Sequence, residues 1–140
     1  MWFHLNHTVA ALSIMRTTMG ADLEGARPHT YHQSAELFYL LDGQLQLLAR
    51  DQVIIASKGY RVVIPPDMAH AFATPPGHAA DFPIAQAPGL PRFEYFRLVE
   101  RLKQGEATLS ELLASQELYD NHFLKSRTWH VVRKQAHHHE

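Results

Sequence analysis

The chain has 140 residues, of which 46% are hydrophobic and 19% are charged, and its formal net charge at pH 7 is −1. This composition is typical of a single globular domain and excludes an intrinsically disordered chain. The near-zero charge argues against nucleic-acid and anionic-membrane partners, which bind basic surfaces, and the absence of cysteine excludes disulfides and thiolate metal sites.

Up to about residue 87, the sequence shows short runs of strand-forming residues separated by turn residues. Residues 8–19 predict one or two strands, and the glycines, proline and charges of residues 20–28 predict a loop. Asp42–Gly43 predicts a type I′ hairpin. A succession of short strands and turns is typical of a β-sandwich or β-barrel. The further strands are expected over residues 36–41, 44–49, 53–56, 60–64 and 69–73.

The pattern changes after about residue 90. Apolar residues recur at helical spacing over Arg92–Lys103, and Thr108 and Glu111 have the spacing of a capping box that starts a second helix. The β-branched residues of 128–132 are compatible with a last short strand. The expected organisation is one domain (residues 1–140) made of a barrel (about 8–90) and a helical tail (about 91–125).

Two segments combine histidine and glutamate with turn residues at fixed spacings. In the first, Glu36 is followed after six residues by Gly43. In the second, Gly59 is followed after five residues by Pro65, and His70 follows Pro65 after four. These spacings resemble the two motifs of the cupin superfamily, G(X)5HXH(X)3,4E(X)6G and G(X)5PXG(X)2H(X)3N.

The resemblance implies an all-β fold, the cupin or jelly-roll β-barrel (double-stranded β-helix, RmlC-like), with a C-terminal helical extension. In particular, the chain resembles small single-domain bacterial cupins similar to quercetin 2,3-dioxygenase. The cofactor implied is one divalent metal ion inside the barrel, and histidine and carboxylate ligands suit Fe, Mn, Ni, Cu or Zn. Open positions on such a metal accept water, oxygen or substrate.

The histidine pair HXH of the first motif is incomplete in this chain. Because alternate residues of a strand face the same side, an intact HXH would place two imidazoles in the barrel. If four residues precede Glu36 in the motif, the pair falls on His29 and Tyr31. If three residues precede it, the pair falls on Thr30 and His32.

We favour the alignment on His29 and Tyr31, so the resemblance assigns His29, Glu36 and His70 as metal ligands and puts Tyr31 in place of a histidine. His32 is a further candidate ligand if a β-bulge turns its ring into the barrel. Glu36 and Tyr31 are also candidate catalytic residues, Glu36 as a base and Tyr31 as a hydrogen-bond donor to a bound ligand.

The resemblance implies a small-molecule oxidoreductase of the dioxygenase type that depends on the metal. Two alternatives stay open. One is a non-catalytic or metal-free protein that binds small molecules. The other is a metal-independent isomerase or cyclase that uses His70, Tyr31 and Glu36 for proton transfer.

The expected partner is a small-molecule substrate or ligand, with no nucleic acid and no membrane. Cupins often pair into dimers by sheet extension, and an exposed N-terminal strand can pair in this way, so the resemblance implies a homodimer. No apolar run approaches the ~20 residues of a membrane span, and Arg16, Asp22 and Glu24 interrupt any signal-peptide pattern. We therefore expect a cytoplasmic location.

Overall fold

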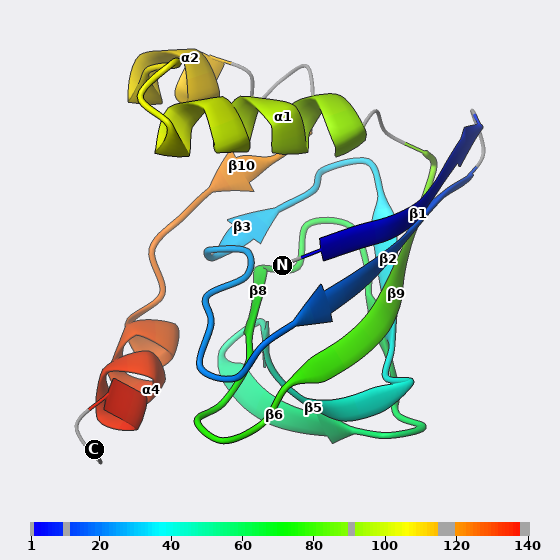
Figure 1. Cartoon of the computed structure of the whole chain (residues 1–140), viewed down its shortest axis with the longest axis vertical. Coiled ribbons are helices and arrows are strands. Elements are labelled where there is room, and N and C mark those ends of the chain that lie inside the picture. Colours follow the sequence, from blue (N-terminus) through cyan, green and yellow to red (C-terminus); the bar gives the residue numbers. More distant parts are fainter. Residues whose placement is uncertain (1, 10–11, 90–91, 115–119, 138–140) are drawn as a thin grey trace.

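The computed structural model describes residues 2–9, 12–89, 92–114 and 120–137. Within them, the strands of the barrel come first and the helices follow, as expected from the change of pattern after about residue 90, with one short strand among the helices. Figure 1 shows α1 and α2 across one end of the strands and α4 against their side. None of the described helices is long and apolar enough to cross a membrane. The elements are β1 (Trp2–Val9), β2 (Leu12–Met19), β3 (His29–Thr30), β4 (Ala35–Tyr39), β5 (Asp42–Ala49), β6 (Gln52–Ser57), β7 (Arg61–Ile64), β8 (His70–Ala73), β9 (Ala80–Ala87), α1 (Arg92–Lys103), α2 (Leu109–Ala114), β10 (His122–Phe123) and α4 (Arg127–His137).

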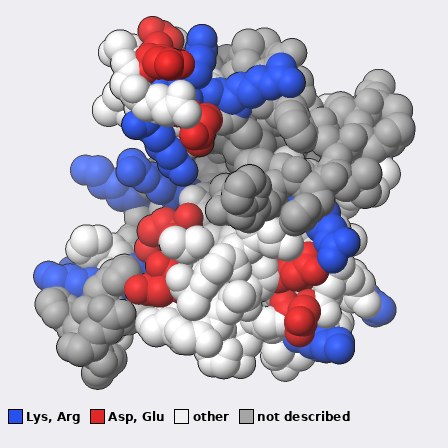
Figure 2. Space-filling view, viewed as in Figure 1, with Lys and Arg blue, Asp and Glu red and all other residues white. Residues whose placement is uncertain are grey.

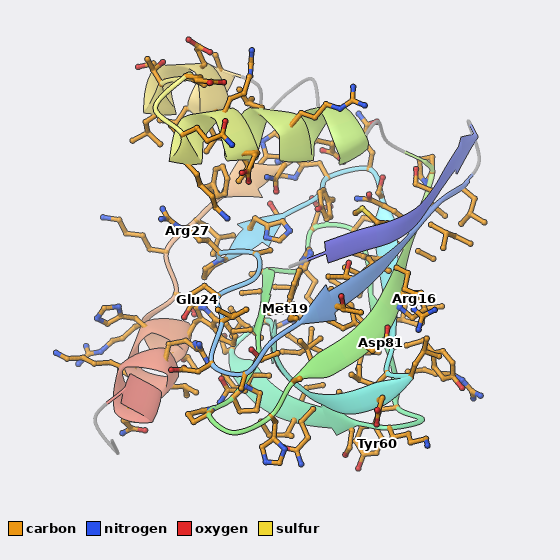
Figure 3. All side chains as sticks on the ribbon, in the orientation of Figure 1. Arg16, Met19, Glu24, Arg27, Tyr60 and Asp81 are labelled. Carbon is orange, nitrogen blue, oxygen red and sulfur yellow. The ribbon has the colours of Figure 1, made fainter. Side chains whose placement is uncertain are left out.

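The strands form two antiparallel halves that face each other. We call β1-β2-β9-β4-β7 sheet 1 and β6-β5-β8-β3-β10 sheet 2. The start of β5 pairs with β9, where Asp42 stands opposite Asp81 and Gly43 opposite Ala80, and this pairing joins the halves. On the outer face of sheet 1, Arg16 and Asp81 point toward one another (Figure 3), with two contacts of 2.9 and 2.6 Å that tie β2 to β9. The hydrogen bond to Asp81 also raises the pKa of Arg16.

The prediction of a hairpin at Asp42–Gly43 is wrong. Strand β4 pairs with β7 and β9, whereas β5 pairs with β6, β8 and β9, so the chain passes between sheets at this point instead of folding back. Gly43 has φ +80°, and a Cβ there would overlap the carbonyl oxygen of Ala79. Glycine is therefore required by the close approach of β5 to the segment before β9.

The main core is a buried cluster that contains three aromatic rings in contact with one another. The ring of Phe72 lies 5.5 Å from that of Phe38 and 5.6 Å from that of Phe82, measured between centroids. Leu45 and Leu47 of β5 pack into the same buried cluster. Strand β9 contributes its alternate residues Ala80, Phe82 and Ile84, as expected for a strand with one face toward the core.

The prediction of a last strand over residues 128–132 is also wrong, because these residues lie within helix α4. The hydroxyl of Ser126 accepts a hydrogen bond from the backbone N–H of Trp129 and caps the helix. Trp129 then packs on Leu48 and Ala71, on the outer face of sheet 2. Buried apolar contact on one helix face outweighs the weak strand preference of β-branched residues.

The helices α1 and α2 meet strand β10. Leu98 of α1 and Leu112 of α2 pack together, and Phe123 of β10 packs against them. The capping hydrogen bond expected at the start of α2 is present, because Thr108 Oγ1 accepts from the N–H of Glu111. Figure 2 shows several Lys and Arg side chains around α1, while the barrel face below it is mostly uncharged, with both acidic and basic groups at its flanks.

Candidate metal centre

Two histidines face each other across neighbouring strands of sheet 2. His29 on β3 stands opposite His70 on β8, and their ring centroids are 4.2 Å apart. The exposed fractions of these residues are only 2% and 1%. The strand register thus brings together two imidazoles that lie 41 residues apart in the sequence.

Each of these rings is oriented by a backbone carbonyl. Nδ1 of His29 lies 2.6 Å from the carbonyl oxygen of Arg27, and Nδ1 of His70 lies 3.0 Å from that of Met68. Because a carbonyl oxygen can only accept, each Nδ1 carries the proton and donates it. In the neutral ring, Nε2 then carries the lone pair, which is the arrangement of a histidine that binds a metal.

Glu36 reaches the histidines from sheet 1. Its Oε2 atom lies 2.7 Å from Nε2 of His70, and the residue is 4% exposed. One ligand atom of each of the three residues His29, Glu36 and His70 lies within 4.8 Å of the others. These three residues form the candidate metal centre, between the two sheets of the barrel.

The contact between Glu36 and His70 joins two acceptor atoms when Nε2 of His70 carries no proton. Among the described residues, neither Oε2 of Glu36 nor Nε2 of His70 has a hydrogen-bond partner, although both atoms are buried. Two electron-rich atoms at 2.7 Å repel each other unless a cation lies between or beside them. The donor set therefore fits a divalent metal ion.

Tyr31 forms one wall of the centre. It is buried, and its ring centroid lies 5.0 Å from that of His29 and 5.3 Å from that of His70. The structure thus places Tyr31 beside the cluster, as the alignment of His29 and Tyr31 with the HXH motif expects.

The structure does not bring His32 to the cluster. Its side chain is half exposed, its Nδ1 lies 2.8 Å from Oδ1 of Asp67, and its ring stacks on that of His122 at 4.0 Å. Residues 31–34 form a loop between β3 and β4, with no bulged strand that could turn the ring inward. Asp67 stands where the second cupin motif has glycine, and it adopts φ +66°, a conformation that aspartate tolerates better than most residues.

One residue that shapes this loop was not singled out from the sequence. The carboxylate of Asp120 accepts hydrogen bonds from the backbone N–H groups of His32 and Gln33, at 3.0 and 2.9 Å. Next to it, β10 pairs with β3, so that Phe123 stands opposite His29. The segment after α2 therefore holds both the ligand strand and the loop that follows it, and no local sequence pattern indicates such a long-range contact.

Comparisons with known proteins support the fold that carries this site. Residues 17–80 match the Cupin domain family, and this segment includes all three residues of the cluster. The sequence matches no curated protein. The match and the structures below confirm the fold class expected from the sequence, a cupin β-barrel with C-terminal helices, while the finer likeness to quercetin dioxygenase stays a prediction.

Three solved structures illustrate the likeness. A cupin protein from Bacteroides fragilis has a TM-score of 0.54 at 16% identity, over 57% of this chain and 68% of that one. KdgF from Halomonas sp. has a TM-score of 0.52 at 17% identity, over 59% and 73%. The polyketide cyclase RemF from Streptomyces resistomycificus has a TM-score of 0.51 at 20% identity, over 59% and 58%. At these identities, the likeness shows the fold alone.

Proposed function

We propose that this chain, which has the cupin fold, is a metal-dependent enzyme of the dioxygenase type that acts on a small organic molecule. The observation that carries the proposal is the buried set of two histidines and one carboxylate, His29, His70 and Glu36. Two histidines and one carboxylate with open positions are the ligand set of non-haem Fe(II) oxygenases. The departure from the cupin motif at Tyr31 leads to this set, because it leaves two histidines where the motif has three.

The side chains have defined roles in this proposal. Nε2 of His29, Nε2 of His70 and the carboxylate of Glu36 would hold the metal, and the carbonyls of Arg27 and Met68 keep both rings in the required tautomer. A bound Fe(II) would supply a site where oxygen and an organic substrate meet. Burial of the cluster excludes bulk water and strengthens every electrostatic interaction inside it.

Tyr31 and Glu36 would act on the substrate. The ring of Tyr31 packs beside both imidazoles, and in this proposal its hydroxyl would orient an organic ligand at the centre. A carboxylate oxygen of Glu36 that is not bound to the metal can accept a proton from the substrate. The small-molecule partner expected from the sequence is thus part of the same proposal.

Elemental analysis and oxygen consumption together test the proposed function. Protein reconstituted anaerobically with Fe(II) is expected to hold one metal ion per chain and to consume oxygen with at least one member of a panel of small phenolic and enolic compounds. A chain that holds no stoichiometric metal under these conditions contradicts the proposal.

A second candidate is a metal-independent isomerase or cyclase. The 2.7 Å contact between Glu36 and His70 favours this candidate if a proton, instead of a metal ion, lies between the two side chains. The two residues would then be a buried acid and base beside Tyr31. The similar structure of RemF is that of a polyketide cyclase. Activity that survives a chelator but is lost in His70→Ala would support this candidate, whereas ligand binding without any turnover would indicate a binding protein.

We also propose that two copies associate through β1. This eight-residue strand pairs only with β2 among the described strands, so one of its backbone edges is open. Open edges are templates for pairing with another chain. Sedimentation velocity is expected to give a species of twice the chain mass, and a monomer at micromolar concentration would contradict the dimer.

A further inference from the structure

Gln86 lies beside Glu36 in one row of side chains across sheet 1. Strand β9 pairs with β4 so that Gln86 stands opposite Glu36, and it pairs with β2 so that Gln86 stands opposite Ser13. Directly opposite residues of an antiparallel pair project to the same face, with Cβ atoms ~5 Å apart. All three residues are buried. The Gln86 side chain therefore faces the barrel interior at the level of the candidate metal centre.

The neighbouring row of sheet 1 is apolar. Two residues along each strand, Ile84 stands opposite Met15 on one side and Phe38 on the other, and all three are buried. The polar row of Ser13, Gln86 and Glu36 is thus confined to this level of sheet 1, and the next row along the strands already belongs to the apolar core. Core packing alone does not account for an amide at this place.

The amide nitrogen of Gln86 is buried and has no hydrogen-bond partner among the described residues. Unpaired buried donors destabilise a folded protein, and native structures contain few of them. Binding sites are an exception, because a ligand completes the hydrogen bond. As a cross-strand neighbour of Glu36, the Gln86 amide is within reach of a small molecule that also touches the metal ligands.

We propose that Gln86 is a positioning residue for the substrate, and that its amide N–H donates to an oxygen of the bound molecule. The substrate class is an organic molecule with two neighbouring oxygens. One oxygen binds the metal, and the other, a carbonyl, carboxylate or phenolate oxygen, accepts from Gln86. The statement that one substrate oxygen binds a metal rests on the proposed function, whereas the placement of the unpaired amide does not.

The stability of the metal-free protein gives the first test. Gln86→Leu replaces the unpaired amide with an apolar group of similar size, and Gln86→Met is a second variant of the same kind. Both are expected to keep the thermal midpoint or raise it by about 3 °C. A fall of about 3 °C or more in both variants would mean that the amide has a structural partner, and would overturn the inference.

The second test measures ligand binding with cobalt(II) in the site, followed by visible absorption. Acetohydroxamate supplies two neighbouring oxygens, and imidazole is the control because it binds through one nitrogen and offers no oxygen. Gln86→Leu is expected to take up as much cobalt as the unsubstituted protein, to bind acetohydroxamate about tenfold more weakly, and to bind imidazole equally well.

The outcomes separate the inference from the proposed function. Equal acetohydroxamate affinity in both proteins overturns the role of Gln86 and leaves the metal centre intact. Loss of cobalt in Gln86→Leu would make Gln86 a ligand and also overturn the positioning role. If the unsubstituted protein takes up no cobalt, the proposed function fails, and the inference fails with it.

Discussion

Nε2 of His70 lies 2.7 Å from Oε2 of Glu36, although the two residues belong to different sheets. The contact bridges the barrel interior, and a cation has to accompany two such atoms at this distance. If the cation is a metal ion, His29 supplies the third ligand atom. The chemistry of the protein therefore depends on whether a metal ion or a proton occupies this place.

Removal of one imidazole should abolish metal uptake. His70→Ala is expected to weaken Fe(II) or Co(II) affinity by more than about 100-fold, because loss of a ligand exceeds the effect of losing a group that only orients a ligand. Equilibrium dialysis with elemental analysis measures it. His78→Ala is the matched control, since His78 is exposed and lies outside the cluster. Equal uptake by the two variants would place the metal elsewhere.

The position of Tyr31 should accept a third histidine ligand. Tyr31→His is expected to raise metal affinity about tenfold, because it restores an imidazole beside His29 and His70. Tyr31→Phe should leave metal affinity nearly unchanged, since the three ligand side chains stay in place. Competition with a chelator of known affinity measures both. Loss of metal in Tyr31→Phe would show instead that the phenol oxygen is itself a ligand.

Asp120 should stabilise the loop next to the centre. Asp120→Asn keeps the size of the side chain and tolerates the φ of +50°, but it can accept only one of the two backbone hydrogen bonds. We expect the free energy of unfolding to fall by about 1–2 kcal/mol in urea titrations followed by circular dichroism. An unchanged unfolding midpoint would show that the two hydrogen bonds contribute nothing to stability.

Arg133 should hold α4 on the barrel. Its guanidinium contacts Glu24 at 2.7 Å, the side-chain oxygen of Gln46 at 2.8 Å and the carbonyl of Thr74 at 3.0 Å. Arg133→Met leaves two buried acceptors unpaired and should lower the free energy of unfolding by about 2 kcal/mol. The exposed neighbour substitution Lys134→Met is the control in the same urea titration. If both variants unfold at the same urea concentration, Arg133 does not anchor the helix.

Short runs of strand-forming residues that end at turn residues are enough to predict the β-barrel from the sequence. The motif spacing also identifies Glu36 and His70 from opposite sheets, because each stands at a fixed distance from a turn residue. The same reasoning fails at Asp42–Gly43. A local turn signal shows that the chain bends, but it cannot tell a hairpin from a crossing between sheets, which depends on distant pairing with β9.

The choice between His29 and His32 shows a second limit. Strand alternation predicts which side chains share a face only while the strand is continuous, and β3 contains just His29–Thr30 before the loop begins. The direction of His32 is then set by Asp67 and Asp120, the second of which lies 88 residues further along the chain. Helix α4 was missed for a similar reason, since its buried face exists only against the barrel.

The pairing of β10 with β3 has a consequence for biosynthesis. By the time Ala87 leaves the ribosome, all strands of the barrel proper have been made, yet β3 still lacks its outer neighbour. Only after Phe123 has emerged can the tail cover the backbone beside His29. Since chains are completed from the N-terminus at about 5–20 residues per second, the nascent barrel passes through a period of seconds in which this edge is uncovered. Metal delivered to the finished chain meets β3 already paired with β10, whereas metal that arrives during synthesis meets β3 without this neighbour.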